Sequence, residues 1–430
     1  MLGLLLSFPL NASAQNTEIS LGLDEAVRLA LESNLNLKKS QIDIDASGYS
    51  EKYLWSELFP AINANGSISH TNASGSAAQN NSGFRYSMGL GLSLGLNAGI
   101  PYSMKIIRLA HMGDILKYED AKNQLSIQIT KKFFTLLAEK NNLLVLEDVL
   151  NLAQRQYERN DVSFRNGLVR ELAVIQSRLA VENARYDLSA ANTAYANNTQ
   201  EFFAMLGLPS DSNISLLGEI NILKIEADAE TLIQQHLSQR PDIARSMQEI
   251  ERLQHAERQS YMQTRAPSLT LSMDYNISSF DPLSDAFTSS ARLNIPVDSW
   301  IPFTSRGQSA RKAKDAIEKA KLDLTMTEDA AKTQIRSLAA LLRNSWDSIT
   351  IARLSLEVAQ RNYELTEQGF RNGTVESLAL EDARNGMANA RQRLLQSELS
   401  YFNMILDISA ALNADWKNFM QTFGVSGEKE

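Results

Sequence analysis

The stretch that decides the fold reads AQRQYERNDVSFRNGLVREL, residues 153–172, and it recurs as AQRNYELTEQGFRNGTVESL, residues 359–378. The same offset of 206 residues relates Asn183 to Asn389 and Tyr195 to Tyr401. Chance does not easily hold one register over so long a stretch, which indicates two copies of one structural unit. We predict a first repeat at 15–208, a connecting segment at 209–230, a second repeat at 231–412 and a tail at 413–430.

Apolar residues at seven-residue spacing lead into both copies of this stretch. Such spacing keeps one stripe of a helix against a neighbour, which predicts long coiled-coil-like helices. The Asn-Gly steps at 166–167 and 372–373 interrupt the pattern, because both residue types tolerate the left-handed conformation that ends a helix. We therefore predict helical hairpins at 102–206 and 308–412, preceded by helices at 20–58 and 231–264. The apolar series are Ile129, Leu136, Leu143, Leu150, Tyr157 and Ile335, Leu342, Ile349, Leu356, Tyr363.

Ahead of each hairpin the apolar spacing changes to every second residue, which predicts strands. Segments of this length, apolar on one face and small or polar on the other, match the wall of a membrane β-barrel. We predict strands at 61–70, 84–98, 268–278 and 287–297. The clearest alternation sets Phe84, Tyr86, Met88, Leu90, Leu92, Leu94 and Leu96 against Arg85, Ser87, Gly89, Gly91, Ser93, Gly95 and Asn97.

Four strands cannot close a barrel around a channel. An open sheet edge in lipid leaves backbone N–H and C=O groups unpaired at several kcal/mol each, so other copies must pair it. Two copies would give eight strands with a filled interior, whereas three give twelve strands and a lumen. We predict a mainly α protein with a membrane β-barrel, in which a homotrimer forms a 12-stranded barrel and an α-helical tunnel. The alternative is a soluble β-sandwich with helical arms, which would bury the apolar face against a second sheet.

Composition removes several classes of partner and site. The net charge is −8, whereas binding to nucleic acid needs a basic face. The chain lacks cysteine, and with it disulfides, thiolate metal sites and lipid attachment to cysteine. The apolar run from Leu2 to Leu10, followed by Ala12-Ser13-Ala14, predicts a signal-peptide remnant at 1–14, although the basic segment of a secretory signal is missing. The alternative is an exposed apolar tail on a cytosolic protein.

The residues of an enzyme or a cofactor site are not found together. The four histidines, His70, His111, His236 and His255, are isolated and lack the spacing of metal ligands. The glycines at 89, 91 and 95 do not fit the phosphate-binding spacing and follow a strand pattern. We therefore predict no enzymatic activity, no cofactor and no metal.

Several short motifs lie at comparable places in the two repeats. They are Leu23-Asp24-Glu25-Ala26-Val27, Arg240-Pro241-Asp242-Ile243, Pro60 and Pro267 before strands, Ile295-Pro296 after one, and the turns 167–172 and 373–378. Each motif is weak alone, but together they resemble the TolC-like outer-membrane efflux protein family over nearly the whole mature chain. The resemblance implies a trimer with its barrel in the outer membrane of a bacterial cell and its helical tunnel in the periplasm.

The resemblance also implies a function and partners. The duct would carry solutes or secreted polypeptides outward, in a tripartite pump or type I secretion system, from an inner-membrane transporter through a periplasmic adaptor (membrane fusion) protein. The substrate would be chosen mainly by the pump. The implied adaptor-docking tips are Arg165, Gly167, Val169, Arg170, Glu171, Arg371, Gly373, Thr374, Glu376 and Ser377. The alternative is a periplasmic or cytosolic coiled-coil scaffold without a pore.

A candidate pore constriction follows from the same resemblance. Asp382 matches the second constriction carboxylate of the family, and Glu381 lies beside it. Three copies would form an acidic ring that raises the local cation concentration. Family tips often carry another carboxylate where this chain has Ala173 and Ala379, so part of the acidic motif is lacking. The alternative is that Glu381 and Asp382 are ordinary solvated charges on a helix surface.

Overall fold

The computed structural model describes residues 19–71, 83–209, 214–219, 222–279, 284–301 and 303–425. The predicted signal-peptide remnant and most of both loops between paired strands lie outside these residues. The chain divides into two compact units, each described by itself. The hairpin unit comprises Met1–Lys38, Asp120–Leu237 and Ala331–Glu430, and the sheet unit comprises Lys39–Glu119 and Ser238–Ala330.

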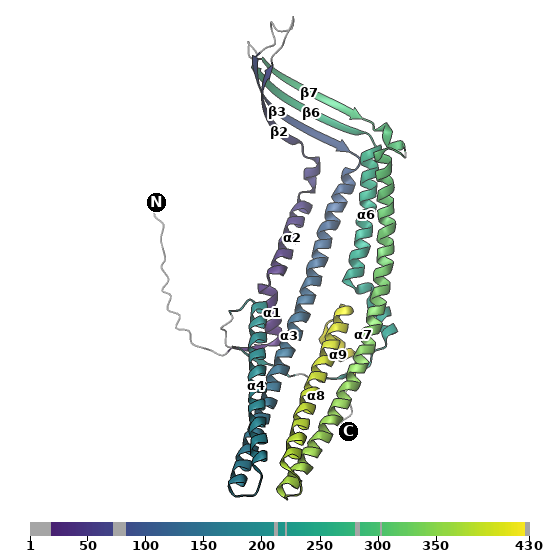
Figure 1. The fold of residues 1–430 in the computed structure, drawn as a ribbon. Helices are drawn as coiled ribbons and strands as arrows, with labels where there is room; N and C mark the ends of the chain where they lie inside the picture. Colours follow the sequence, from purple (N-terminus) through teal and green to yellow (C-terminus); the bar gives the residue numbers. More distant parts are fainter. Residues whose placement is uncertain are drawn as a thin grey trace. The chain divides into compact units, whose positions relative to one another are not determined.

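The sheet unit contains a four-stranded antiparallel sheet in the order β2-β3-β6-β7 (Figure 1). Its register places Leu90 beside Ala64 and Tyr275, so the apolar residues of neighbouring strands share one face. That face is open to solvent in the single chain, where Met88 is 70% exposed. The strands are β2 (Ala61–Thr71), β3 (Gly83–Asn97), β6 (Ser268–Ser279) and β7 (Ser284–Asn294).

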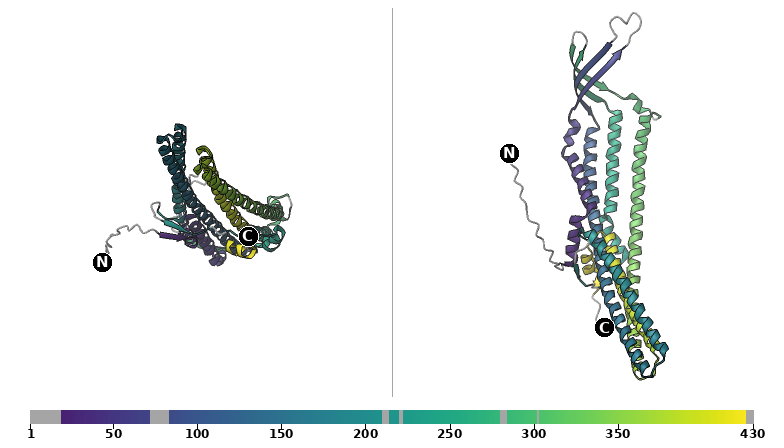
Figure 2. Two further views of the ribbon diagram at one scale, coloured as in Figure 1. Left: turned by 90° about the horizontal axis from the view of Figure 1, so that it is seen from below. Right: turned by 60° about the vertical axis from the view of Figure 1, so that its left-hand side comes forward.

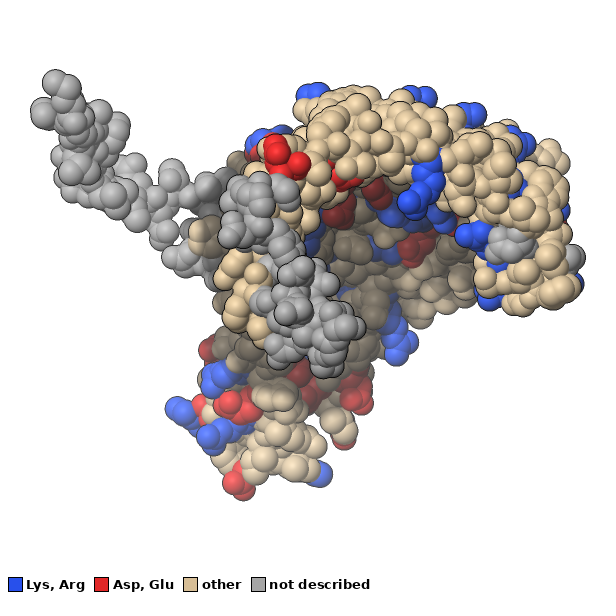
Figure 3. Space-filling model, turned by 90° about the horizontal axis from the view of Figure 1, so that it is seen from above, with Lys and Arg blue, Asp and Glu red and all other residues tan. Residues whose placement is uncertain are grey.

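The opposite face of the sheet carries small and polar residues. Gly91 lies between Asn63 and Asp274, and Ser87 lies between Ser67 and Ser278. The absence of a side chain at Gly91 lets the Asp274 carboxylate lie across β3, since a Cβ there would approach its Oδ1 to 2.6 Å. In the view from above, most of the atoms nearest the viewer that are not grey belong to residues other than Lys, Arg, Asp and Glu (Figure 3). The charged residues of the four strands are Arg85, Asp274, Asp285 and Arg292.

The prediction of the fourth strand at 287–297 is wrong at both ends. β7 runs from Ser284 to Asn294, and the 3-10 helix η3 (Val297–Trp300) follows it. Proline has no N–H to donate to a strand partner, so Pro296 cannot continue the ladder. The early start follows from pairing with β6, in which Ser284 lies opposite Ser278.

Both helices predicted ahead of the strands are interrupted, at repeat-equivalent positions. The segment 20–58 contains β1 (Ile19–Gly22), α1 (Leu23–Ser33), α2 (Leu35–Lys52) and η1 (Leu54–Leu58), and the segment 231–264 contains α5 (Ala229–His236), η2 (Leu237–Gln239) and α6 (Pro241–Arg265). Asn34 Oδ1 accepts the N–H groups of Asn36 and Leu37, at 2.9 and 3.1 Å, and so starts a new helix. Arg240 is extended because a residue before proline is disfavoured in the helical conformation.

Two long helical hairpins dominate the hairpin unit (Figures 1 and 2). Within the predicted apolar series, Ile129, Leu136, Ile335, Leu342 and Ile349 are buried, and the remaining members are half-buried. The ends of the two long helices, Arg165 and Arg371, differ by the offset of the repeat, 206 residues. The helices are α3 (Ile100–Arg165), α4 (Glu171–Leu206), α7 (Ser305–Arg371) and α8 (Ser377–Ala411), and the first parts of α3 and α7 belong to the sheet unit.

The predicted connecting segment and tail contain short helices and strands that we did not assign from the sequence. β4 (Ile214–Leu217) pairs with β1 in parallel, and β5 (Lys224–Ile225) pairs with β8 (Gly424–Val425). Helix α9 (Trp416–Phe423) buries Phe419 and Met420 and sets Trp416 against Phe402, with ring centroids 5.3 Å apart. These elements are too short for a periodic pattern to reveal them.

Within the described part of the chain, no helix has both the length and the apolar character needed to cross a membrane.

Candidate functional site

The two turns that join the long helices have the same backbone geometry. Gly167 and Gly373 have φ of 72° and 74°, in the left-handed region that favours glycine. In the first turn, the N–H of Gly167 donates to Phe164 O at 2.8 Å and that of Leu168 to Ser163 O at 2.9 Å. Gly373 and Thr374 repeat this pair of bonds at 3.0 and 2.9 Å. These bonds define a Schellman motif, which satisfies the last carbonyls of the helix.

The predicted tip residues cluster around these turns and are mostly exposed. Arg165 forms an ion pair with Asp161 at 2.7 Å, and Arg371 forms one with Glu367 at 2.7 Å. Arg170 and Glu376 precede the return helices α4 and α8, which begin at Glu171 and Ser377. Val169 is half-buried, whereas Thr374 is exposed and its hydroxyl donates to Gly369 O at 3.0 Å. The first turn therefore presents charged and apolar groups together, with Leu168 76% exposed, whereas the second turn has the polar Thr374 at the equivalent position.

Two buried side chains connect the helices of the first tip by hydrogen bonds, and we did not predict this link from the sequence. Gln156 Nε2 donates to Asn160 Oδ1 at 3.0 Å, and Asn160 Nδ2 donates to the carbonyl of Ala173 at 3.2 Å. The link joins α3 to α4 behind the turn. The repeat-equivalent positions in α7 are Asn362, which is exposed, and Thr366, which is half-buried. The two tips therefore share a backbone geometry but differ in this side-chain brace.

The two candidate constriction residues lie in different surroundings. Asp382 is exposed, whereas Glu381 is half-buried and lines a cavity of about 570 Å³ between α3, α4 and α8. Burial raises the pKa of Glu381 from its ordinary value, although the charge of Arg384 acts in the opposite direction. Consecutive residues on a helix point about 100° apart, so one can face a helix seam while the next faces solvent. The structure does not bring the two carboxylates together on one surface.

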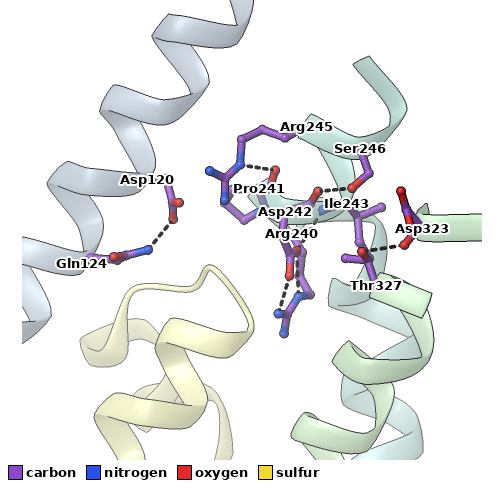
Figure 4. Close-up of polar contacts among 10 residues, drawn as sticks. All are labelled: Asp120, Gln124, Arg240, Pro241, Asp242, Ile243, Arg245, Ser246, Asp323 and Thr327. Carbon is purple, nitrogen blue, oxygen red and sulfur yellow. Dashed lines mark hydrogen bonds and ion pairs between the residues drawn. The ribbon is translucent and has the colours of Figure 1, made fainter. Parts of the chain in front are cut away.

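The Arg240-Pro241-Asp242-Ile243 motif forms the start of α6 (Figure 4). Arg240 donates to both carboxylate oxygens of Asp242, at 3.0 and 2.7 Å, and Ser246 bonds back to the Asp242 carbonyl at 3.0 Å. Burial would raise the pKa of Asp242, but the hydrogen bonds and charge of Arg240 hold it below its ordinary value. The carboxylate also suits the positive end of the helix. This motif is a helix start, and the described residues hold no group of His, Cys, Asp and Glu that could bind a metal.

Two helices of the hairpin unit carry exposed apolar stripes. The spacing of three, four or seven residues puts each set on one side of its helix. The α4 stripe consists of Leu172, Ile175, Leu179 and Tyr186, and the α7 stripe consists of Ile351, Leu354, Val358 and Leu365. In a single chain both stripes face solvent, which is the pattern of helices that pack against a partner.

Comparisons with known proteins agree with this geometry. The model of a family described as "Outer membrane efflux protein" matches residues 26–208 and 232–414, two segments displaced by 206 residues. The chain is 23% identical over 418 residues to the probable efflux pump outer membrane protein TtgC of Pseudomonas putida, covering 92% of this chain and 83% of TtgC. It is 24% identical over 412 residues to the cation efflux system protein CusC of Escherichia coli, covering 90% and 85%. The fold resembles the CmeC outer membrane channel of Campylobacter jejuni, with a TM-score of 0.76, 19% identity, and coverage of 93% of this chain and 88% of CmeC.

Proposed function

The chain belongs to the outer membrane efflux protein family, and from this membership we propose that three copies form an outer-membrane channel of a tripartite pump. In this proposal the sheets close into a 12-stranded barrel, the helical hairpins line a periplasmic tunnel, and solutes or polypeptides leave the cell through both.

The observation that carries the proposal is the open sheet with one continuous apolar face. Leu90, Tyr275 and Phe287 follow one another across β3, β6 and β7 on that face. The described sheet ends at β2 on one side and at β7 on the other. An apolar face suits lipid, but lipid cannot satisfy the backbone groups of two open edges. Pairing the edges with other copies removes both edges at once.

The strand directions allow this closure. Each neighbouring pair in the sheet is antiparallel, so β2 and β7 run in opposite directions. β7 of one copy can therefore add to β2 of the next copy as a further antiparallel strand. A register that places Ile62 on the same face as Leu293 keeps the barrel apolar outside and polar inside. In the hairpin unit, the α4 stripe of one copy would cover the α7 stripe of the next.

We infer the partner proteins from the exposed hairpin tips and from the descriptions of the related proteins. We assign the hairpin tips at 165–171 and 371–377 to an adaptor protein that connects the duct to an inner-membrane transporter. TtgC is described as an efflux pump outer membrane protein and CusC as part of a cation efflux system, which supports efflux but not one common cargo.

Fractionation followed by conductance measurement tests the proposal. The mature protein should be recovered from outer membranes only with detergent, and should produce discrete conductance steps in a planar bilayer. Recovery in the soluble fraction without conductance would favour the coiled-coil scaffold instead.

A further inference from the structure

Arg265, the last residue of α6, lies between two aromatic rings. Its guanidinium carbon is 4.7 Å from the centroid of the Tyr261 ring and 5.2 Å from that of the Trp300 ring, so both rings hold it by cation–π contacts. Tyr261 belongs to α6, and Trp300 belongs to η3, which packs beside the end of that helix (Figure 1). Within the described part of the chain, Arg265 forms no ion pair with a carboxylate. The protein therefore positions this cation without neutralising it.

Exposed apolar residues continue the apolar face of the sheet past the end of β7. Trp300 is 61% exposed and Phe303 is 81% exposed. Tryptophan gathers where a lipid-facing surface meets the phospholipid headgroups, because its ring is apolar and its N–H is polar. In the proposed channel, Trp300 and the neighbouring Arg265 would lie at that depth. The exposed apolar residues after the strand are Ile295, Val297, Trp300, Ile301 and Phe303.

The other edge of the sheet repeats this combination at the same end. β2 begins, and β7 ends, at one end of the antiparallel sheet, since both lie beside the residues that end β3 and begin β6. Just ahead of β2, Trp55 is exposed, and Lys52 lies over the Tyr53 ring at 5.6 Å from its centroid. An exposed tryptophan near a cation held on a ring therefore occurs at both edges. This repetition indicates that one common surface meets this end of the sheet.

The chain that follows β7 carries an excess of positive charge. The whole chain has a net charge of −8, but residues 295–314 contain four basic residues and one acidic residue. All four basic side chains are exposed in the single chain. Together with Arg265 they make this region complementary to an anionic surface. The four residues, all in the first part of α7, are Arg306, Arg311, Lys312 and Lys314.

We propose that Arg265 and Trp300 form a site for the headgroup of an anionic phospholipid at this end of the sheet. The N–H donors of the guanidinium suit the oxygens of a phosphate group, and the two rings hold them in position. A net negative headgroup is preferred to a zwitterionic one, because the start of α7 attracts negative charge and repels an ammonium group. The inference rests on the proposed channel function, since it requires the sheet to lie in a bilayer.

Lipid retention by the purified full-length protein tests the site. The protein is equilibrated in detergent with equal amounts of phosphatidylglycerol and phosphatidylcholine that carry the same acyl chains, and the lipids that remain bound after gel filtration are quantified. The wild type should retain more phosphatidylglycerol. Arg265→Gln should lower the ratio of the two lipids about fivefold, the effect of one basic residue beside an anionic surface. Equal retention in the wild type, or an unchanged ratio in Arg265→Gln, would overturn the proposal.

Arg252 on the same helix supplies a matched control. It is already paired with Glu249 at 2.6 Å, and it precedes Arg265 by 13 residues, the difference between 265 and 252. At about 1.5 Å per residue, about 20 Å of helix separates the two positions. Arg252→Gln therefore makes the same chemical change away from the sheet and should leave the lipid ratio unchanged. An equal loss in both variants would reject a site at Arg265.

Two further arms identify what occupies the site. Sodium phosphate should displace no more phosphatidylglycerol than sodium chloride does at the same ionic strength, and stronger displacement would indicate a site for free phosphate and reject the lipid site. Light scattering measures assembly in the same samples. If Arg265→Gln reduced assembly but left the lipid ratio unchanged, a neighbouring copy would cover Trp300 and the proposal would be wrong.

Lipid preference and conductance can fail separately. A wild-type protein that conducts but shows no preference for phosphatidylglycerol would reject only the lipid site. A protein that shows the preference and loses it in Arg265→Gln, but never conducts, would support the lipid site and contradict the channel function.

Discussion

Single residues with unusual backbone or burial control the hairpin tips. Gly373 adopts φ of 74°, and a Cβ built there would meet no atom within 4 Å. A side chain at position 373 would therefore destabilise the protein through the strained backbone conformation and not through a clash with neighbouring atoms. Gly386 on α8 also has open space around it but lies in an ordinary helix, so the two glycines separate these causes.

We predict that Gly373→Ala lowers the free energy of unfolding by about 1–2 kcal/mol, the cost of the left-handed conformation for a residue with a side chain. Gly386→Ala should be neutral or raise it by up to about 1 kcal/mol, because alanine favours helix. Urea denaturation of both variants measures the difference. Equal effects would show that the left-handed turn is not the cause.

Glu381 gives a pH dependence with a defined sign. Burial raises its folded-state pKa above the ordinary value of 4.5, so the folded protein keeps this proton at pH values where the unfolded chain has lost it. Its contribution to stability is present below pH 4.5 and is lost as the pH rises through the raised pKa. We predict that Glu381→Gln is increasingly more stable than the wild type as the pH rises through this window. Parallel stability curves for the two proteins would contradict this.

For single residues, the sequence predicted the positions of the turns better than the burial and hydrogen bonding of side chains. The Asn-Gly steps predicted the left-handed positions, because that preference is local to one residue. The burial of Arg384 and the bond from Asn160 to Ala173 could not be predicted, because they depend on helices that meet only in the folded hairpin unit. The different burial of Glu381 and Asp382 could not be predicted for the same reason. Each residue's surroundings are set by which neighbour its side of α8 meets.

At the scale of elements, the two faces of β3 should differ sharply in what they tolerate. Leu90 lies at the middle of β3 on the apolar face, and Ser87 lies on the polar face of the same strand. We predict that Leu90→Arg costs about 2–4 kcal/mol in lipid and reduces the protein recovered in outer membranes, because a charge would face the bilayer midplane. Ser87→Arg should insert normally. Quantitative blotting of membrane fractions measures both, and equal recovery would argue against a lipid-facing apolar surface.

The observed bounds of the helices and strands show which of them the apolar periodicity of the sequence predicts and which it does not. Alternation over β3 and β6 is long enough to define the faces. The displacement of β7 came from strand pairing and from Pro296. The breaks in the two helices predicted ahead of the strands came from side-chain capping by Asn34 and from the extended conformation of Arg240 before Pro241. Helix α9 has eight residues and depends on packing of Trp416 against Phe402. Short elements held by distant contacts leave little periodic pattern in a sequence.

For the whole molecule, we expect a polar substitution in the α4 stripe or the α7 stripe to reduce assembly of the copies without unfolding the single chain. We predict that Leu354→Asp on the α7 stripe lowers the fraction of assembled protein, because it places a charge in a contact between copies. Ser355 is exposed beside the stripe, so Ser355→Asp should assemble normally. Size-exclusion chromatography with light scattering in detergent measures the assembled fraction. Loss of assembly in both variants, or in neither, would contradict this use of the α7 stripe.

The number of copies is the part of the architecture that one chain cannot display. In the proposed assembly the open sheet edges and the exposed stripes pair with other copies, and the count of three rests on the width of a barrel with twelve strands. Native mass spectrometry of the detergent-extracted mature protein tests this most directly. The account predicts one dominant species that contains three chains. A stable species of one or two chains, with no larger assembly, would contradict it.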